Sequence, residues 1–275
     1  MSDSVPVLHD VLRALAAAGG RTYVVGGGSR DPLLGLVPDD QDCEVFNLPE
    51  ARMVEVLSGF GKASLVGDKP GQESRGVYLL HNLPDVSFGL PRRDRQIGES
   101  NTSVRVDIDP NMSIADAARR RDFTVNAIYV NPLTGERVDP YGGLRDLEAG
   151  VLRAVDEKTF GEDPLRAIRA LRFHARFEFA VEPATLDIVR KCDLSKEPPE
   201  RLWAEFNKIF DIRTKRPGDA FRLLYDTDLS RFIPELHAIR DTPQDKLYHP
   251  EGVVGRAHTC MGLDEMRTEC VERGF

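Results

Sequence analysis

The amino-acid sequence predicts an α+β protein, with a small mixed sheet and its helices in the first part of the chain and helices alone afterwards. Short apolar runs separated by Gly, Pro and Asn turns dominate before about residue 100, which is typical of strands. Helical periodicity appears between these runs and prevails beyond about residue 150. The turn cluster Asp139–Gly143 lies between the two regions and is the best candidate boundary.

The elements of the first part follow from their local patterns. Val5–Ala18 has apolar residues at helical spacing and ends at a glycine pair, which predicts a helix with a glycine stop. Short β-rich runs between turns predict strands at Thr22–Val25, Asp42–Phe46, Ala63–Val66, Val77–Leu80 and Asp85–Phe88. Further helices are predicted from Asp31 onward, over Pro49–Leu57 and over Ile114–Arg121.

The remaining segments are read in the same way. The polar stretch Arg95–Thr102 contains a glycine and is predicted to be a loop. The apolar stretch Phe123–Val130 has an ambiguous period. In the second part, helices are predicted near residues 163–178, 183–192, 199–212 and 217–226.

Composition narrows the class of protein. The chain has 275 residues, 41% hydrophobic and 30% charged, as in an ordinary globular protein. No apolar run approaches the ~20 residues that a membrane span needs, and the N-terminus lacks a basic-then-apolar signal pattern. The cysteines show no metal-ligand spacing, so we expect free thiols in a reducing cytoplasm. They are Cys43, Cys192, Cys260 and Cys270.

The net charge of −8 argues against a protein that binds nucleic acid through its overall charge. Three local basic runs remain as possible tracks, although solvated helix ends or loops are the alternative for each. The runs lie at Arg92–Arg95, Arg119–Arg121 and Arg213–Arg216.

The stretch Tyr23–Gly35 places a glycine triplet between an apolar run and the predicted helix start at Asp31. Counted from Gly26, the spacing does not match the dinucleotide motif G-x-G-x-x-G, and the GKS or GKT of a P-loop is absent. The functional interpretation is that Gly27 lets backbone N–H groups reach a phosphate while Arg30 supplies a cationic fork. A plain strand-to-helix turn is the alternative.

Asp40 and Asp42 stand two residues apart at the head of a predicted strand, so their side chains point to the same face. Two carboxylates in this arrangement suit a divalent cation, and Mg²⁺ is the natural one where phosphate oxygens complete its shell. A phosphate-binding turn next to such a cation site is the arrangement that nucleotidyl transfer needs. That reaction usually employs a third acid, and Asp85 on a later strand is the candidate. An acidic turn that faces solvent is the alternative.

Six motifs then occur in order: VVGGGSRDPLLG, DQDCEVF, Arg120–Ala127, Asp139–Asp146, Glu162–Arg166 and Glu200–Glu205. Together they resemble the ordered motifs of class II tRNA nucleotidyltransferases, the bacterial CCA-adding enzymes, which have bacterial poly(A) polymerase as a close relative. The resemblance runs from about Tyr23 to Glu205, and a weaker similarity continues to His258.

The resemblance implies an architecture and an activity. It implies a polymerase-β-like nucleotidyltransferase head over residues 1–145, an all-α nucleotide-selecting neck over 146–212 and a partial helical body over 213–275. The implied enzyme adds CCA, or its terminal A, to tRNA 3′ ends from CTP and ATP with Mg²⁺. A poly(A) polymerase and a catalytically weak RNA- or nucleotide-binding module remain alternatives. The stretch Arg92–Met112 is not visibly shortened, which favours CCA or terminal-A addition over CC addition.

The resemblance also assigns roles in the head, position by position. Asp40 and Asp42 match the metal-binding DxD pair. The positions that match contacts to phosphates and ribose are Gly27, Arg30, Arg121 and Asp122.

In the neck, Asp163 and Arg166 match the pair that hydrogen-bonds the Watson–Crick edge of CTP or ATP. The residues agree with this, since an acceptor and a bidentate donor one helical turn apart could read both bases. Arg169 and Arg172 match arginines near the nucleotide and primer end. Residues expected to brace this template are Glu200, Arg201 and Glu205. A solvated helix with surface ion pairs is the alternative for the whole set.

The C-terminal part departs from the family pattern. Tyr248–Gly252 and His258 look like the beginning of an HD-type phosphohydrolase domain of long members, but no histidine–aspartate doublet follows before Phe275. We therefore expect His249 and His258 to lack partners and to form no metal site, and a phosphohydrolase is disfavoured. A short natural form, a truncated form and a divergent member are all compatible with this end, and the oligomeric state is open.

Overall fold

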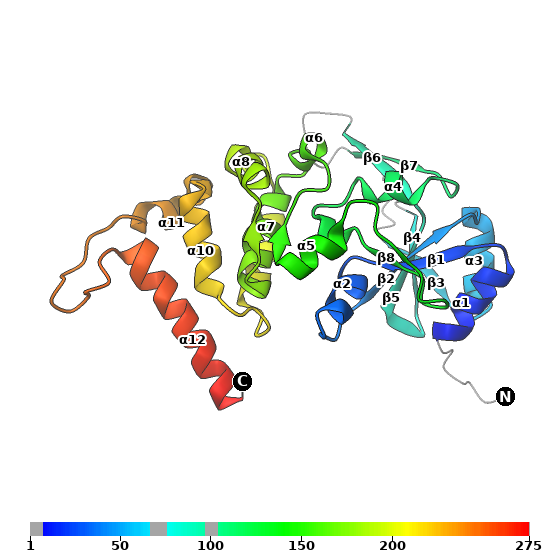
Figure 1. The fold of residues 1–275 in the computed structure, drawn as a ribbon, viewed down its shortest axis with the longest axis horizontal. Helices are drawn as coiled ribbons and strands as arrows, with labels where there is room; N and C mark the ends of the chain where they lie inside the picture. The colour runs from blue at the N-terminus through cyan, green and yellow to red at the C-terminus, as the bar shows by residue number, and fades with distance from the viewer. Residues whose placement is uncertain (1–7, 67–75, 97–103, 275) are drawn as a thin grey trace. The chain divides into compact units, whose positions relative to one another are not determined.

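The computed structural model describes residues 8–66, 76–96 and 104–274. Contacts divide the chain into two compact units, residues 1–145 and 146–275 (Figure 1). The first unit combines strands with helices and the second is almost entirely helical, so the predicted α+β class is confirmed. Within the described residues, no helix is both long and apolar enough to cross a membrane.

A seven-stranded mixed sheet forms the centre of the first unit, with the strand order β3-β4-β5-β2-β1-β8-β9. Strand β2 (Gln41–Phe46) lies in the middle, antiparallel to β1 (Arg21–Val25) and parallel to β5 (Leu83–Gly89). The other strands are β3 (Ala63–Leu65), β4 (Val77–Leu80), β8 (Tyr129–Val130) and β9 (Arg137–Val138). The central place of β2 gives the residues at its start a rigid support.

One face of this sheet packs on helices α1 (Leu8–Ala17) and α3 (Glu50–Ser58), which lie side by side in Figure 1. The buried side chains here include Val11, Leu15, Met53, Leu57, Cys43, Val45 and Phe88. Because successive side chains of a strand alternate between faces, the core positions Cys43 and Val45 leave Asp42 and Glu44 on the opposite face. The apolar half of β2 therefore determines where its acidic half points.

Two helix predictions for the first unit were wrong in detail, and one hairpin was missed. The helix expected from Asp31 is α2 (Gly27–Leu33) and already begins at Gly27. The helix expected over Ile114–Arg121 is α4 (Ile114–Ala118), which ends before the arginine run. A β-hairpin of β6 (Arg92–Gln96) and β7 (Val104–Ile108) was not predicted.

The predicted loop Arg95–Thr102 begins inside β6, because Arg95 and Gln96 pair with β7. The rest of that stretch lies outside the described residues. The stretch of ambiguous period, Phe123–Val130, forms the 3₁₀ turn η1 (Thr124–Asn126) and β8.

The second unit is organised around α7 (Leu165–Phe177), most of whose residues are buried. It packs against α8 (Pro183–Lys191), α9 (Pro199–Asn207) and α10 (Pro217–Asp226), all within or close to the predicted ranges. The further elements are α6 (Glu157–Phe160), α11 (Pro234–Ile239), α12 (Cys260–Arg273), the 3₁₀ turns η2 (Lys208–Phe210) and η3 (Leu229–Phe232), and the π-helical turn η4 (Val254–Thr259).

A few short elements complete the chain. Helix α5 (Gly143–Ala149) follows the predicted turn cluster, and β10 (Val151–Leu152) pairs in parallel with β11 (Ala180–Val181). The roles assigned to residues 1–145, 146–212 and 213–275 stay predictions.

Candidate active site

Asp40 and Asp42 lie at the start of β2, exposed to solvent. Asp42 Oδ1 accepts a hydrogen bond of 2.6 Å from Ser87 Oγ, because the parallel register of β2 and β5 sets these two residues opposite each other. Partial desolvation of the Asp40 carboxyl group raises its pKa, and the negative charges of Asp42 and Asp39 raise it further. Clustered carboxylates that repel one another in this way fit a divalent cation, which would relieve the repulsion.

Asp85 lies on β5, two residues before Ser87, so it is on the same face of the sheet as Asp42. Its side chain is exposed. Its assignment as the third carboxylate stays a prediction. Ser87 itself was missed, since only the pairing of β5 with β2 shows that its hydroxyl reaches Asp42.

A cavity of about 150 Å³ lies beside Asp42. Its lining joins carboxylates and guanidinium groups from strands β2 and β6 and from the arginine run after α4. The polar residues in it are Asp42, Glu44, Ser87, Arg92, Arg120 and Arg121. A cavity with both signs of charge suits a phosphate group that carries a cation.

Arg121 is held by a buried cluster on this face. Its Nη2 lies 3.5 Å from Glu44 Oε2, its Nε donates to Tyr129 Oη at 3.5 Å, and its guanidinium lies 5.4 Å from the Tyr129 ring centre. Arg120 Nη2 lies 3.0 Å from Glu44 Oε1. Burial would raise the pKa of Glu44, but Arg120 and Arg121 outweigh it and lower that pKa. Glu44 is therefore ionised and paired.

Two positions in the glycine triplet require glycine, one for its backbone conformation and one for lack of space. Gly26 adopts a φ of +66°, which favours glycine. A Cβ on Gly28 would lie 2.7 Å from Val24 Cγ1, so no side chain fits between α2 and β1 there. Gly27 has more room, since a Cβ on it would lie 3.8 Å from its nearest neighbour, Arg30 Nη2. The phosphate contact predicted for Gly27 stays a prediction.

Arg30 is buried, with its Nε donating to Asp31 Oδ1 at 2.7 Å and its Nη1 donating to Asn126 Oδ1 at 2.5 Å. Asn126 Nδ2 in turn donates to Asp122 Oδ1 at 2.9 Å, and the Phe123 N–H donates to the same oxygen at 2.8 Å. The predicted residues Arg30 and Asp122 thus belong to one buried network linked by Asn126, which sequence reasoning missed. This network joins α2 to η1 and gives both residues a structural task in addition to any contact with a nucleotide.

In the second unit, Asp163 and Arg166 lie at the start of α7. Asp163 Oδ1 lies 3.6 Å from Arg201 Nη2 on α9, so the predicted brace by Arg201 is present. Arg166 Nη1 donates to the Thr159 carbonyl at 2.9 Å, and its guanidinium lies 6.0 Å from the Phe160 ring centre. Each side chain thus has a polar contact within its own unit. The selection of a base by this pair stays a prediction.

Arg169 and Arg172 face Glu205 on α9. Arg172 Nε lies 3.2 Å from Glu205 Oε2, and Arg169 Nη1 lies 3.9 Å from Oε1. Burial alone would raise the pKa of Glu205, but Arg172, Lys208 and Arg169 lower it. Arg172 is only 7% exposed, so the alternative of a solvated side chain does not hold for this one arginine. Arg166 and Arg169 are partly exposed, and their predicted roles stay predictions.

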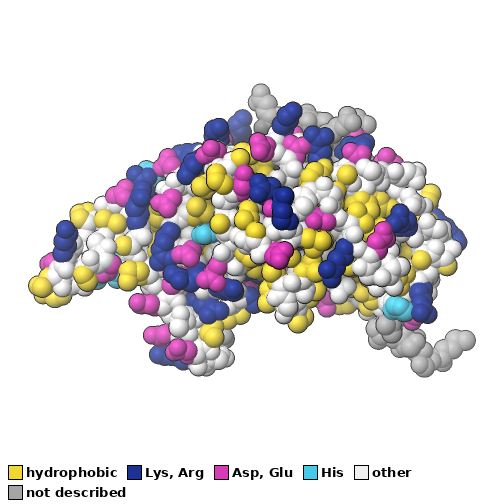
Figure 2. All heavy atoms as spheres, in the orientation of Figure 1, with side chains coloured by type: hydrophobic (Ala, Val, Ile, Leu, Met, Phe, Trp, Pro, Cys, Tyr) yellow, Lys and Arg dark blue, Asp and Glu magenta, His cyan; other side chains and the backbone are white. Residues whose placement is uncertain are grey.

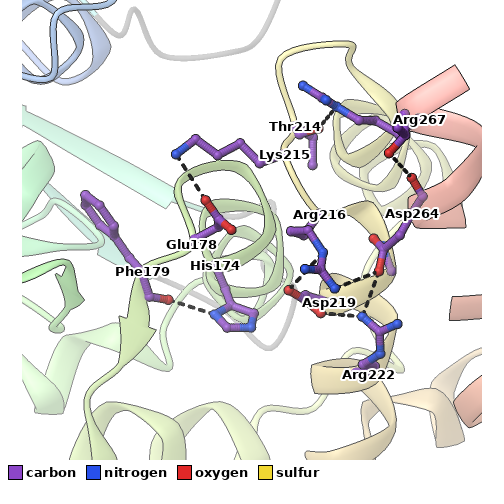
Figure 3. A network of polar contacts seen from close by, with 12 residues as sticks. His174, Glu178, Phe179, Thr214, Lys215, Arg216, Asp219, Arg222, Asp264 and Arg267 are labelled. Carbon is purple, nitrogen blue, oxygen red and sulfur yellow. Dashed lines mark hydrogen bonds and ion pairs between the residues drawn. The ribbon is translucent and has the colours of Figure 1, made fainter. Parts of the chain in front are cut away.

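The basic run Arg213–Arg216 is engaged in ion pairs within the second unit (Figure 3). Lys215 Nζ lies 3.1 Å from Glu178 Oε2, and Arg216 Nη2 lies 3.3 Å from Asp264 Oδ2. On the face in Figure 2, basic and acidic side chains are interspersed over the helices of this unit. Opposite charges thus offset one another along this run.

The expectation that His249 and His258 lack partners was wrong. Glu251 Oε1 lies 3.2 Å from His249 Nδ1 and 2.6 Å from His258 Nδ1. A hydrogen bond to the Glu251 backbone, followed by that from His258, lowers the pKa of Glu251. The ligand atoms of the three residues lie within 4.8 Å of one another.

Two family profiles match the chain. Residues 22–153 match the poly A polymerase head domain, and residues 178–240 match the probable RNA and SrmB-binding site of polymerase A. Curated relatives named multifunctional CCA protein are 37% identical in Stenotrophomonas maltophilia and 36% identical in Xanthomonas campestris, each over 84% of this chain.

Solved structures agree with the profiles. A Bacillus stearothermophilus CCA-adding enzyme in complex with CTP has a TM-score of 0.67 and 28% identity over 81% of this chain and 52% of its own. A Thermotoga maritima CCA-adding enzyme complexed with tRNA has a TM-score of 0.65 and 27% identity over 89% of this chain and 55% of its own. This chain belongs to the tRNA nucleotidyltransferase and poly(A) polymerase family. The predicted resemblance is confirmed.

Length separates this family member from those relatives. The chain spans 55% of the curated proteins from Stenotrophomonas and Xanthomonas. The match to each of them extends over 239 residues.

Proposed function

We propose that this chain is a template-independent tRNA nucleotidyltransferase that adds CCA, or its terminal A, to tRNA 3′ ends from CTP and ATP. The observation that carries the proposal is the position of Asp40 and Asp42. They are exposed at the head of the central strand, beside a cavity that also contains Arg120 and Arg121. Such a site can hold a triphosphate and its cation next to an attacking hydroxyl group.

Members of this family generally need a divalent cation. We propose Mg²⁺, held by Asp40 and Asp42, because hard oxygen ligands and mutually repelling carboxylates fit this ion. When bound, it would activate the tRNA 3′-hydroxyl and steady the triphosphate while pyrophosphate leaves. Asp85 is the proposed third carboxylate on the same face of the sheet.

The remaining head residues would position the nucleotide. Arg121 would meet phosphates and ribose from its fixed place against Tyr129 and Glu44. The backbone turn at Gly27 would contact a phosphate of the same nucleotide. The buried network that links Arg30 to Asp122 would support the contacts of these two residues to phosphates and ribose. We propose that catalysis involves no covalent enzyme intermediate and depends on positioning and charge neutralisation.

We propose that Asp163 and Arg166 select the base. Their contacts to Arg201 and to the Thr159 carbonyl restrict both side chains, which supports recognition of an edge by fixed groups. Arg169 and Arg172 would lie near the nucleotide and the primer end, with Glu205 holding both.

We also propose that the protein acts in the cytoplasm. The four cysteines are free, and Cys43, Cys192 and Cys260 are buried, which suits a reducing compartment. Burial raises the pKa of Cys43 to about 12, so this thiol stays protonated and unreactive.

The test is incorporation of labelled CTP and ATP, supplied separately, into tRNAs that end before the first C, before the second C or before the terminal A. Stepwise incorporation of CTP and then ATP supports CCA addition. Incorporation of ATP alone, limited to one residue on the CC-ending tRNA, supports terminal-A addition. A long ATP-derived tail would identify a poly(A) polymerase instead, and absence of incorporation from all three tRNAs would contradict the catalytic proposal.

A further inference from the structure

Glu44 is a buried carboxylate directly behind the candidate metal ligands. It lies on the same face of β2 as Asp42, two residues further along, and is 3% exposed. Its Oε1 lies 3.0 Å from Arg120 Nη2, and its Oε2 accepts a 2.7 Å hydrogen bond from Tyr129 Oη. Together with Arg121, these residues bring three donor side chains to the Glu44 carboxylate. Their contacts offset the free-energy cost of burying its charge.

The cluster fixes the direction of the Arg121 guanidinium. Glu44 engages it from one side at 3.5 Å, and the Tyr129 ring lies against it with a centre 5.4 Å away. A guanidinium has five N–H donors, more than the contacts to Glu44 and Tyr129 use. Arg121 can therefore remain paired with Glu44 and still donate to a phosphate oxygen in the cavity.

Asp42 shares this cavity with Arg120 and Arg121, and its charge also acts on Arg121. If Glu44 lost its charge, these arginines would be drawn to Asp42, because it is a carboxylate lining the same cavity and opposite charges attract at short range. That ion pair would occupy a carboxylate needed for the cation. Glu44 is the carboxylate in a position to prevent it.

We propose that Glu44 is a positioning residue that holds Arg120 and Arg121 for the triphosphate and keeps them from pairing with Asp42. This inference rests on the proposed function, because it explains how the arginines of the same site are oriented. Glu44 itself is not proposed to touch the nucleotide. It differs from a merely structural residue because its loss should weaken nucleotide and cation binding in a folded protein.

The test uses Glu44→Gln, which keeps the shape of the side chain and removes its charge. We expect the dissociation constants of CTP and ATP with Mg²⁺, measured by calorimetry, to rise at least about tenfold. The Mg²⁺ concentration for half-maximal incorporation should also rise, because released arginines compete for Asp42. The loss should appear mainly in KM, with a smaller change in kcat.

A matched control is Glu50→Gln. Glu50 also accepts a hydrogen bond from a tyrosine, Tyr78 Oη at 2.8 Å, in the same unit but outside the cavity. This variant should bind nucleotide as the wild type does. Glu44→Asp keeps the charge and should restore part of the affinity, falling between the wild type and Glu44→Gln.

The outcomes separate the two proposals. An unchanged nucleotide affinity in folded Glu44→Gln overturns the inference, as does an equal loss in Glu50→Gln. If Glu44→Gln does not fold, wild-type affinity in Glu44→Asp overturns it. A wild-type chain that binds nucleotide but incorporates none contradicts the proposed function alone, and the affinities of the variants still decide the role of Glu44.

Discussion

At the scale of single residues, two kinds of carboxylate lie on one face of β2. Asp40 and Asp42 are exposed and repel each other, so they fit a cation. Glu44 is enclosed by Arg120, Arg121 and Tyr129, and those contacts keep it ionised in the interior. Asp42 and Glu44 are both carboxylates on the same face of the strand, so the difference in their burial comes from the partners that the fold supplies.

Asp42→Asn should lower nucleotide incorporation by about two to three orders of magnitude, because it removes one charge from the proposed cation site. Asn can still accept the hydrogen bond from Ser87, so we expect the melting temperature to change by only a few degrees. Primer-extension rates and thermal unfolding check this. Asp10→Asn, an exposed change on α1, is the control. Wild-type rates in Asp42→Asn would contradict the assignment.

The ionisation of Glu205 contributes to the stability of the folded chain. Burial alone would raise its pKa, but Arg172, Lys208 and Arg169 outweigh burial and lower the pKa. The folded chain therefore holds this proton more weakly than the unfolded chain. The stabilisation is complete above the unfolded-state carboxyl pKa of about 4.3 and is lost as the pH falls through the lower folded-state pKa.

Glu205→Gln should accordingly destabilise the protein by about 3 kcal/mol at pH 7, since it removes the negative charge that lies 3.2 Å from the buried Arg172. The difference from the wild type should shrink below about pH 4. Urea unfolding at both pH values measures it. Glu200→Gln, an exposed change on the same helix, should have little effect. A difference that grows on acidification would refute this account.

At the scale of elements, strands and helices with strong periodicity were predicted well, as β1, β2, α3 and α10 show. The misses have physical causes. Helix α2 begins at Gly27 because the packing of Gly28 against Val24 outweighs the low helix propensity of glycine. In the β6–β7 hairpin, β6 (RRDRQ) has charged and polar residues alone, so no pattern predicts a strand there. The alternation of β7 (VRVDI) is a strand signal that the sequence analysis missed.

The contact between α10 and α12 gives a test of element packing. A Cβ on Gly218 would lie 2.1 Å from the Cys260 carbonyl oxygen and 2.8 Å from the side chain of Asp264. Asp264, labelled in Figure 3, also accepts a hydrogen bond from the Gly218 N–H. Gly218→Ala should therefore destabilise the second unit by about 3 kcal/mol.

Gly262→Ala is the matched control. Gly262 lies on α12, the helix that Gly218 of α10 packs against, and nothing lies within 4 Å of its Cβ position. Alanine there should add up to about 1 kcal/mol of stability through helix propensity. Chemical unfolding of both variants measures the contrast. Equal stability of the two would show that α10 and α12 do not approach this closely in solution.

At the scale of the whole molecule, the net charge is −8 although the proposed partner is an RNA. The described cations that carry the proposal are local: Arg120 and Arg121 in the cavity, and Arg166, Arg169 and Arg172 on α7. Cations inside and outside these groups also pair with carboxylates, as Arg120, Arg172 and Arg216 do. Binding should thus depend on a few contacts and not on the overall field.

Affinity for tRNA should fall at least about tenfold between 50 and 200 mM salt, because even a few phosphate contacts release counterions. Filter binding or fluorescence titration over this range measures the slope. Arg169→Ala should reduce the slope by about one if this residue meets a phosphate. A slope near zero would contradict a tRNA-binding role for this chain.

The sequence by itself determined the fold class, the order of the motifs and the pair Asp40 and Asp42, because alternation along a strand is local. The family assignment also came from local motifs, and the comparisons confirmed it. Long-range contacts were decided only in the tertiary structure. The pairing of β2 with β5 brings Ser87 to Asp42, and the folding of Tyr129 onto β2 encloses Glu44. Ser87 is separated from Asp42 by 45 positions in the sequence, and Tyr129 from Glu44 by 85. No local sequence pattern predicts contacts over such separations.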